Sequence, residues 1–157
     1  MTSESRIASP TLSEPPLARS DLGFLLAKAS QRWNEHLADE LHQRGFPEVR
    51  PSFGSVLVPL FDEDGLRMGE LARQSRLAKQ TMTTMVRLVE QAGLVSRRAD
   101  PADGRAVLVE LTRRGRKLKP VATGVIGELE AQVLALLGEG RTAALRLALA
   151  EVAESWS

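Results

Sequence analysis

Residues 68–95 read MGELARQSRLAKQTMTTMVRLVEQAGLV, and their pattern is the most informative in the chain about its fold. We expect two short helices joined by a tight turn at 76–78, because apolar residues in the second helix recur at three- and four-residue intervals. Those residues are Met82, Met85, Val86 and Val89. Gly93 is expected to end the helix, since glycine takes a positive φ easily. The pattern therefore predicts a helix-turn-helix.

The opposite face of this second helix carries only polar or cationic side chains before Glu90. They are Lys79, Gln80, Thr81, Thr83, Thr84 and Arg87. Short hydrogen-bonding groups flanked by cations match the base edges and phosphates of the DNA major groove. An ordinary solvated helix on a small helical domain gives the same pattern, so the neighbouring sequence has to decide between them.

A basic β-hairpin is predicted directly after the helix. Two extended runs at 94–99 and 105–111 are separated by a Pro/Asp/Gly turn at 100–104. In a DNA-binding protein such a hairpin is a wing, with Arg105 at its tip and Arg97 and Arg98 on its first strand. Thr112 then caps a long helix that begins with Arg113 and Arg114. These cations oppose the helix macrodipole, which a nearby phosphate backbone would compensate.

Composition limits the class of protein. At 157 residues the chain is most simply one domain, and with only 4% aromatic residues its packing must rely on aliphatic side chains, which favours helices. The absence of cysteine excludes disulfides, cysteine-ligated zinc and thiol redox sensing. His36 and His42 lie on different helix faces, so we expect no metal, and no cofactor or enzymatic motif is found. Without a signal peptide or a membrane-length apolar run, the protein is expected to be cytoplasmic, with no membrane partner.

Charge is distributed unevenly along the chain. The net charge of +1 divides into −4 over residues 1–66, +8 over 67–119 and −3 over 120–157. A basic centre between acidic ends indicates a surface for a polyanion.

The remaining elements define the expected domain organisation. Residues 1–19 are predicted to be a disordered arm, and 20–157 a single domain. We expect a helix from an N-cap at Ser20 to about Arg44, a second helix from Pro51 that Pro59 kinks or shortens, a short strand at 66–68, and a last helix from Arg141 to about Ser155. The fold class is mainly α with a small β-wing. Residues 51–112 form the DNA-binding lobe, and the apolar helices of 20–50 and 113–157 form a dimerisation lobe with a second copy.

The wing and its flanks carry a family resemblance. Residues 93–115, GLVSRRADPADGRAVLVELTRRG, resemble the MarR family of bacterial transcriptional regulators through Gly-Leu-Val, two basic residues, Asp-Pro-x-Asp-x-Arg and Leu-Thr-x-x-Gly. The resemblance implies a homodimer on a pseudo-palindromic operator, with recognition helices in major grooves and wings in minor grooves. Arg105 matches the wing-tip arginine and Asp103 the aspartate that orients it. Gly104 and Thr84 stand where basic residues are common, which leaves base preference open.

Two interpretations of function follow from these observations. The first is a sequence-specific DNA-binding transcriptional regulator that acts as a repressor and has no catalytic role.

 
The DNA contacts that this interpretation predicts are Lys79, Gln80, Thr81, Thr83, Thr84, Arg87, Arg97, Arg98, Asp103, Arg105, Arg113 and Arg114. The second is a winged-helix module for protein–protein contact, whose basic face binds an acidic partner.

The resemblance also implies a small aromatic or phenolic effector bound between the two lobes. Trp33, His36, Arg50 and Phe53 are the residues of this sequence that we expect at such a site. For Trp33 and Phe53, packing in the core or in a dimer interface is the alternative interpretation.

Overall fold

The computed structural model describes residues 21–155. The predicted disordered arm at 1–19, the predicted N-cap Ser20 and the terminal Trp156 and Ser157 lie outside the described residues. The chain divides within its first helix into two units, residues 1–33 and 34–157, and each unit is described by itself. The predicted division into a dimerisation lobe and a DNA-binding lobe stays a prediction.

The first unit contains the beginning of helix α1 (Leu22–Gln43). The carboxylate of Asp21 accepts a hydrogen bond from the Phe24 amide at 3.0 Å. The cap that the structure describes is therefore Asp21, one residue after the predicted one, and an aspartate suits this position as well as a serine does.

In the second unit, a short 3₁₀ turn η1 (Pro51–Phe53) leads into helix α2 (Gly54–Asp62). Pro51 thus begins a 3₁₀ turn and not the α-helix itself. Pro59 is buried inside α2, and the helix continues for three residues beyond it to Asp62. That Pro59 kinks or shortens this helix stays a prediction.

The helix-turn-helix is confirmed. Strand β1 (Leu66–Arg67) precedes helix α3 (Met68–Gln74), and helix α4 (Lys79–Gln91) follows after a turn. Met82, Val86 and Val89 are fully buried, whereas Met85 is half-buried. Gly93 has the predicted positive φ, at 77°, and this turn lets the Leu94 amide bond the Val89 carbonyl oxygen at 3.2 Å.

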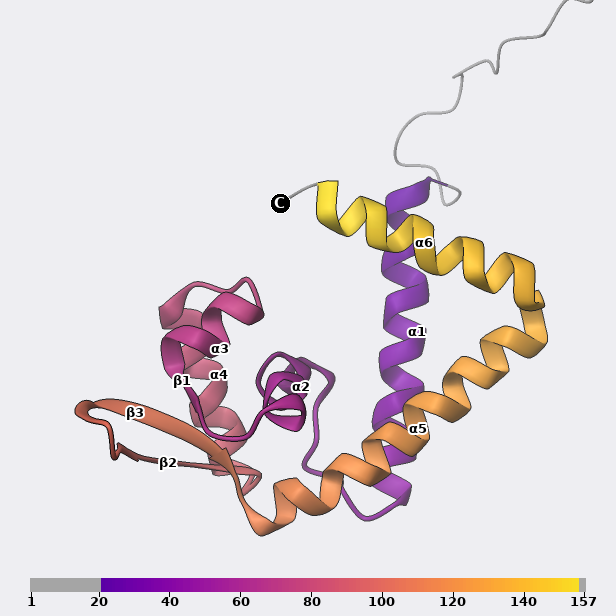
Figure 1. Cartoon of the computed structure of the whole chain (residues 1–157). Coiled ribbons are helices and arrows are strands. Elements are labelled where there is room, and N and C mark those ends of the chain that lie inside the picture. Colours follow the sequence, from indigo (N-terminus) through magenta and orange to yellow (C-terminus); the bar gives the residue numbers. More distant parts are fainter. Residues whose placement is uncertain (1–20, 156–157) are drawn as a thin grey trace, which may run out of the picture. The chain divides into compact units, whose positions relative to one another are not determined.

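The wing is an antiparallel hairpin of β2 (Val95–Asp100) and β3 (Asp103–Leu111), and β1 pairs with the other edge of β3. The register runs from Val95 opposite Leu111 to Asp100 opposite Asp103. Figure 1 shows the hairpin extending away from the helices. The predicted five-residue turn is wrong, because pairing continues to a two-residue turn at 101–102. Arg105 consequently lies in β3, next to the turn and not in it.

Two helices follow the wing, α5 (Arg113–Leu137) and α6 (Glu139–Ser155). The last helix begins two residues before the predicted Arg141. Thr112 caps α5 as predicted, because its hydroxyl oxygen accepts the Gly115 amide at 3.1 Å. A Cβ on Gly115 would collide with the carbonyl oxygen of Leu94 and lie 3.1 Å from Leu111 Cδ2. The Thr-x-x-Gly sequence therefore joins the start of α5 closely to the start of β2.

The core of the second unit lies where α2, α3, α4, the sheet and α5 meet. Its fully buried large side chains are Val56, Leu60, Leu71, Met82, Val86, Val89, Leu94, Val95, Val109, Leu118 and Val125. By length and composition alone, α5 is long and apolar enough to cross a membrane, contrary to the expectation that no apolar run has that length. One such helix is weak evidence for a membrane, and 17% of its apolar window is buried within the chain.

Candidate nucleic-acid interface

The polar face of α4 is open to solvent. Lys79, Gln80, Thr81, Thr84 and Arg87 are exposed and Thr83 is half-buried. The Thr83 hydroxyl donates to the Lys79 carbonyl oxygen at 2.9 Å, and the Thr84 hydroxyl donates to that of Gln80 at 3.2 Å. Because both protons are used within the helix, the two threonines offer outward only acceptor lone pairs and methyl groups.

A concave surface of about 570 Å³ lies between the starts of α3 and α4 and the wing; we call it the α4–wing groove. Its lining residues are Arg67, Met68, Gly69, Glu70, Lys79, Arg97, Arg105, Ala106 and Val107. The groove thus brings together two predicted wing arginines and the first residue of the predicted recognition helix. Four of its lining side chains are cationic, and such a surface attracts a phosphate backbone.

Glu70 is the carboxylate among these lining residues. Hydrogen bonds from Arg73 first, and then from Gln74, lower the pKa of Glu70 to about 2. Glu70 therefore stays ionised at neutral pH, but Arg73 neutralises its charge locally.

The guanidinium group of Arg105 forms no ion pair with any residue in the described part of the chain. Its backbone amide donates to the Asp103 carboxylate at 3.1 Å. The contact joins the two residues that the resemblance pairs, through the backbone of Arg105. The side chain of Arg105 is exposed and remains available to an external anion.

The other wing arginines contact carboxylates of their own chain. Arg97 Nε donates to Glu90 Oε2 at 3.0 Å, and Arg98 Nη2 donates to Glu110 Oε1 at 2.7 Å. The hydrogen bond from Arg98 holds the pKa of Glu110 below its usual range. Both arginines lie on the first strand of the hairpin, as predicted. Each already has a carboxylate partner, which a DNA phosphate would have to replace.

The two arginines in the first turn of α5 differ in whether they contact other residues of their own chain. Arg114 donates to Glu48 and to the Gly45 carbonyl oxygen at 2.7 Å, and its guanidinium lies 4.6 Å from the centroid of the Phe46 ring. Arg113 is exposed and has no ion-pair partner within residues 21–155. The compensation that we expected from phosphate is therefore supplied for Arg114 by the chain itself.

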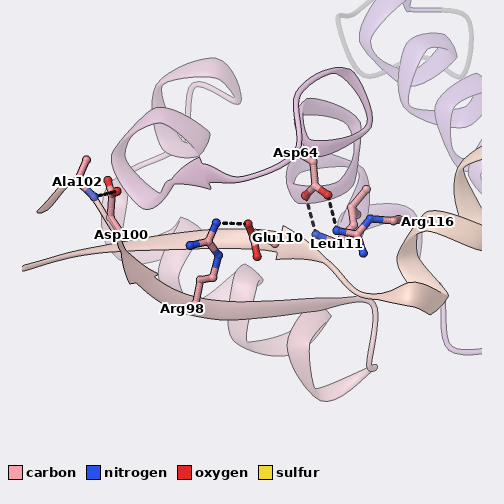
Figure 2. A network of polar contacts seen from close by, with 7 residues as sticks. All are labelled: Asp64, Arg98, Asp100, Ala102, Glu110, Leu111 and Arg116. Carbon is pink, nitrogen blue, oxygen red and sulfur yellow. Dashed lines mark hydrogen bonds and ion pairs between the residues drawn. The ribbon is translucent and has the colours of Figure 1, made fainter. Parts of the chain in front are cut away.

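Four charged residues in or beside the sheet were not predicted as functional, namely Arg67, Asp64, Asp100 and Arg116. Asp100, only 7% exposed, accepts hydrogen bonds from the Ala102 amide at 2.9 Å and from Arg67 Nε at 2.8 Å. The Ala102 amide first, and Arg67 next, lower the pKa of Asp100. Asp64 accepts the Leu111 amide at 2.8 Å and Arg116 Nη2 at 2.9 Å (Figure 2). The acidic turn at 62–65, close in sequence to a predicted strand, was the signal that could have drawn attention to Asp64.

Of the three predicted effector residues that lie in the second unit, Arg50 lines an apolar pocket, whereas His36 and Phe53 do not. An apolar pocket of about 100 Å³ is lined by the end of α1, by α2, by α5 and by Arg50. Phe53 is 2% exposed and belongs to the core, and the exposed His36 does not line the pocket. Trp33 lies in the first unit, so its place relative to this pocket is not described.

Comparison with known proteins now decides the family. The model of the MarR family matches residues 50–107. An HTH-type transcriptional repressor of Mycobacterium tuberculosis is 34% identical over 116 residues, which cover 74% of this chain and 81% of that protein. The chain belongs to the MarR family. Its members are transcriptional regulators and not a class of enzymes.

Solved structures agree with this membership. A probable transcriptional regulator of Pseudomonas aeruginosa is 29% identical, with a TM-score of 0.70 over 85% of this chain and 97% of that chain. The transcriptional repressor CouR, bound to a 23-mer DNA duplex, is 26% identical, with a TM-score of 0.73 over 90% of this chain and 99% of that one. The MarR-family chain described here is a DNA-binding transcriptional regulator.

Proposed function

We propose that the protein is a homodimeric repressor that binds a pseudo-palindromic operator in the cytoplasm and is released by a small aromatic acid. The observation that carries the DNA-binding part is the cationic α4–wing groove, which Lys79 connects to the exposed polar face of α4. A recognition helix in the major groove and a hairpin beside it need this arrangement.

Within this proposal, the cations differ in role from the short polar side chains. Lys79, Arg87, Arg105 and Arg113 contact phosphates or the minor groove, because none of them has an ion-pair partner among the described residues. Gln80 and Thr84 read base edges, Thr84 as an acceptor or through its methyl group. An arginine held beside a hairpin turn suits the narrow minor groove of A·T-rich DNA, where negative potential is concentrated.

The homodimer is supported by the apolar surface of the last two helices. No residue of α6 is buried within the chain, and only 17% of the most apolar window of α5 is buried. Exposed leucines of these helices include Leu134, Leu136, Leu145, Leu147 and Leu149. Apolar surface of this extent is typical of a subunit interface, and a second copy of the chain is the simplest partner.

The effector proposal rests on the apolar pocket of the second unit. Its size is of the order at which an apolar cavity, about 150 Å³ in one engineered case, holds a single aromatic ring. Arg50 at its lining supplies a cation for a carboxylate. A ligand that binds better to the DNA-free arrangement of the lobes would lower operator affinity.

The test is binding to duplex fragments from the intergenic region upstream of the gene, measured by fluorescence anisotropy over a salt series. We expect Arg105→Ala to weaken binding about tenfold and to reduce the salt slope by about 1. Equal affinity and slope in the variant would contradict the role of the wing. Equal binding to heparin and to every duplex would favour the alternative, a basic face for an acidic protein partner.

A separate measurement tests the effector. Aromatic carboxylates and their neutral amides are compared in a thermal-shift screen and then added to the operator complex. We expect only the carboxylates to raise the unfolding temperature and to release DNA, and Arg50→Gln to remove this preference. No shift with any carboxylate would contradict the proposal.

A further inference from the structure

Three ion pairs lie between the wing turn and α5, and we call their six charged side chains the charge network. They are Arg67, Asp100, Arg98, Glu110, Asp64 and Arg116. Three are guanidinium groups and three are carboxylates, so the network adds no net charge. Figure 2 shows Asp64 beside Leu111 and Arg116, and Arg98 beside Glu110 on the hairpin.

Asp64 occupies a special place in this network because it contacts two elements at once. Oδ1 accepts the amide of Leu111, the last residue of β3, at 2.8 Å. Oδ2 accepts Nη2 of Arg116, in the first turn of α5, at 2.9 Å. Asp64 itself belongs to the turn between α2 and β1. One carboxylate thus joins the end of the wing, the start of α5 and the turn after α2.

We propose that Asp64 is a positioning residue for the wing, which fixes the direction of the hairpin relative to α5 and so the place of Arg105. The inference rests on the proposed function, in which Arg105 contacts DNA. β1 pairs with β3 over only two residues, Leu66 and Arg67, so backbone pairing gives the hairpin little support on that edge. The carboxylate of Asp64 supplies a further constraint at the point where the hairpin ends.

Geometry makes this constraint important for Arg105. Six residues separate Arg105 from Leu111, which is about 20 Å of strand, so a rotation of about 5° at Leu111 displaces Arg105 by about 2 Å. A displacement of that size exceeds the tolerance of a hydrogen bond. A small rotation of the hairpin at Leu111 is therefore sufficient to remove a hydrogen bond from Arg105 to DNA.

The matched control for Asp64 is Glu48. It also accepts a hydrogen bond from an arginine in the first turn of α5, Arg114, but within residues 21–155 no hydrogen bond or ion pair joins it to the hairpin. Glu48→Gln and Asp64→Asn each remove one carboxylate that faces α5. Asparagine still offers an oxygen to the Leu111 amide but cannot accept from Arg116 in the same geometry, so Asp64→Asn is expected to fold.

The first experiment measures the wing without DNA, so its outcome does not depend on the proposed function. The chain has no cysteine, and a Cβ added at Gly104 or Gly124 meets no atom within 4 Å. Nitroxide labels at Gly104→Cys and Gly124→Cys report the distance from wing to α5 by pulsed electron resonance, in labelled chain diluted with unlabelled chain. We expect Asp64→Asn to broaden or shift this distance and Glu48→Gln to leave it unchanged. An unchanged distance in Asp64→Asn would overturn the proposal.

The second experiment asks whether Asp64 acts through Arg105. We expect Asp64→Asn to weaken binding to the intergenic fragment about fivefold in the wild-type background and less than about twofold in Arg105→Ala, because neighbouring effects on one contact are not additive. Equal losses in both backgrounds, or the same loss in Glu48→Gln, would overturn the proposal. If no variant or wild-type chain binds any duplex, the proposed function fails, and the label distances alone decide the role of Asp64.

Discussion

The α4–wing groove and the charge network lie on the same small sheet, and both are rich in arginine, yet they use it differently. In the groove, Lys79 and Arg105 form no ion pair with the part of the chain that the structure describes, although Arg97 and Arg67, which also belongs to the charge network, do. In the charge network, Arg98 and Arg116 each contact a carboxylate. The difference shows that a local excess of positive charge does not by itself indicate a DNA contact. The carboxylates close to each arginine in space decide what it is available for.

The largest expected effect concerns the close contact between the start of α5 and the start of β2. In Gly115→Ala the new Cβ would collide with the Leu94 carbonyl oxygen, so α5 must move away from the start of β2. We expect a loss of about 2–3 kcal/mol in the free energy of unfolding, measured by urea denaturation.

Gly124→Ala is the matched control for this prediction. It lies in the same helix, and its Cβ would meet no atom within 4 Å. Alanine has the better helix propensity, so we expect a gain of about 0.5–1 kcal/mol. Similar losses in the two variants would show that the close contact with Leu94 is not what requires glycine at 115.

The next prediction compares two neighbouring arginines, one without an ion-pair partner in the described chain and one with such a partner. Arg113→Ala removes a cation without an ion-pair partner in residues 21–155, so operator affinity should fall about five- to tenfold with a smaller salt slope. Its stability should hold or rise slightly, because a cation leaves the first turn of α5. Arg114→Ala removes the contacts with Glu48, Gly45 and the Phe46 ring, so stability should fall while the salt slope holds.

Anisotropy over a salt series and urea denaturation of both variants provide the measurement. If Arg114→Ala reduced the salt slope as much as Arg113→Ala does, the contacts of an arginine with its own chain would not predict its availability to DNA.

The sequence predicted the elements better than the roles of their charges. The three- and four-residue spacing of Met82, Met85, Val86 and Val89 and the glycine at 93 were sufficient to place α4, because helical periodicity and backbone conformation are local properties. The partners of Arg98 and Arg114 were not predicted, because Glu110 lies 12 residues away and Glu48 lies 66 residues away. Such pairs form only when the sheet register and the packing of α5 are known. The short wing turn was missed for a different reason. A Pro/Asp/Gly composition indicates where a turn lies but not how many residues it takes, and strand pairing continues to Asp100 opposite Asp103.

A third prediction removes the carboxylate partner of an arginine, so that a paired arginine becomes unpaired. Arg97 lines the α4–wing groove but contacts Glu90. Glu90→Gln frees its guanidinium for phosphate and removes a negative charge near the groove, so operator affinity should rise about threefold and the salt slope should increase. The cost in stability should be below about 1 kcal/mol, as for other partly exposed pairs.

Glu63→Gln is the control for Glu90→Gln, since it removes an exposed carboxylate that does not line the groove. A gain of the same size in Glu63→Gln would mean that net charge alone raised the affinity. A loss in Glu90→Gln would mean that Glu90 holds Arg97 in the position that DNA requires.

The smallest expected effect concerns Glu70, a carboxylate that lines the groove and is nevertheless paired as in the charge network. Hydrogen bonds from Arg73 and Gln74 lower its pKa to about 2, against about 4.3 for an unperturbed glutamate. A lowered pKa stabilises the folded state fully above the unfolded value, and this contribution is lost as the pH falls through the folded value. The unfolding midpoint of the wild type should therefore exceed that of Glu70→Gln by a small, constant amount above pH 5, and the difference should shrink between about pH 4.3 and pH 2.

Thermal unfolding of both proteins over this pH range measures the difference, with Glu151→Gln, a change at an exposed residue of α6, as the control. A difference that persisted unchanged to pH 2 would show that the pairing of Glu70 contributes nothing through its charge, and Glu70 would then belong with the side chains of the groove that are available to an external partner.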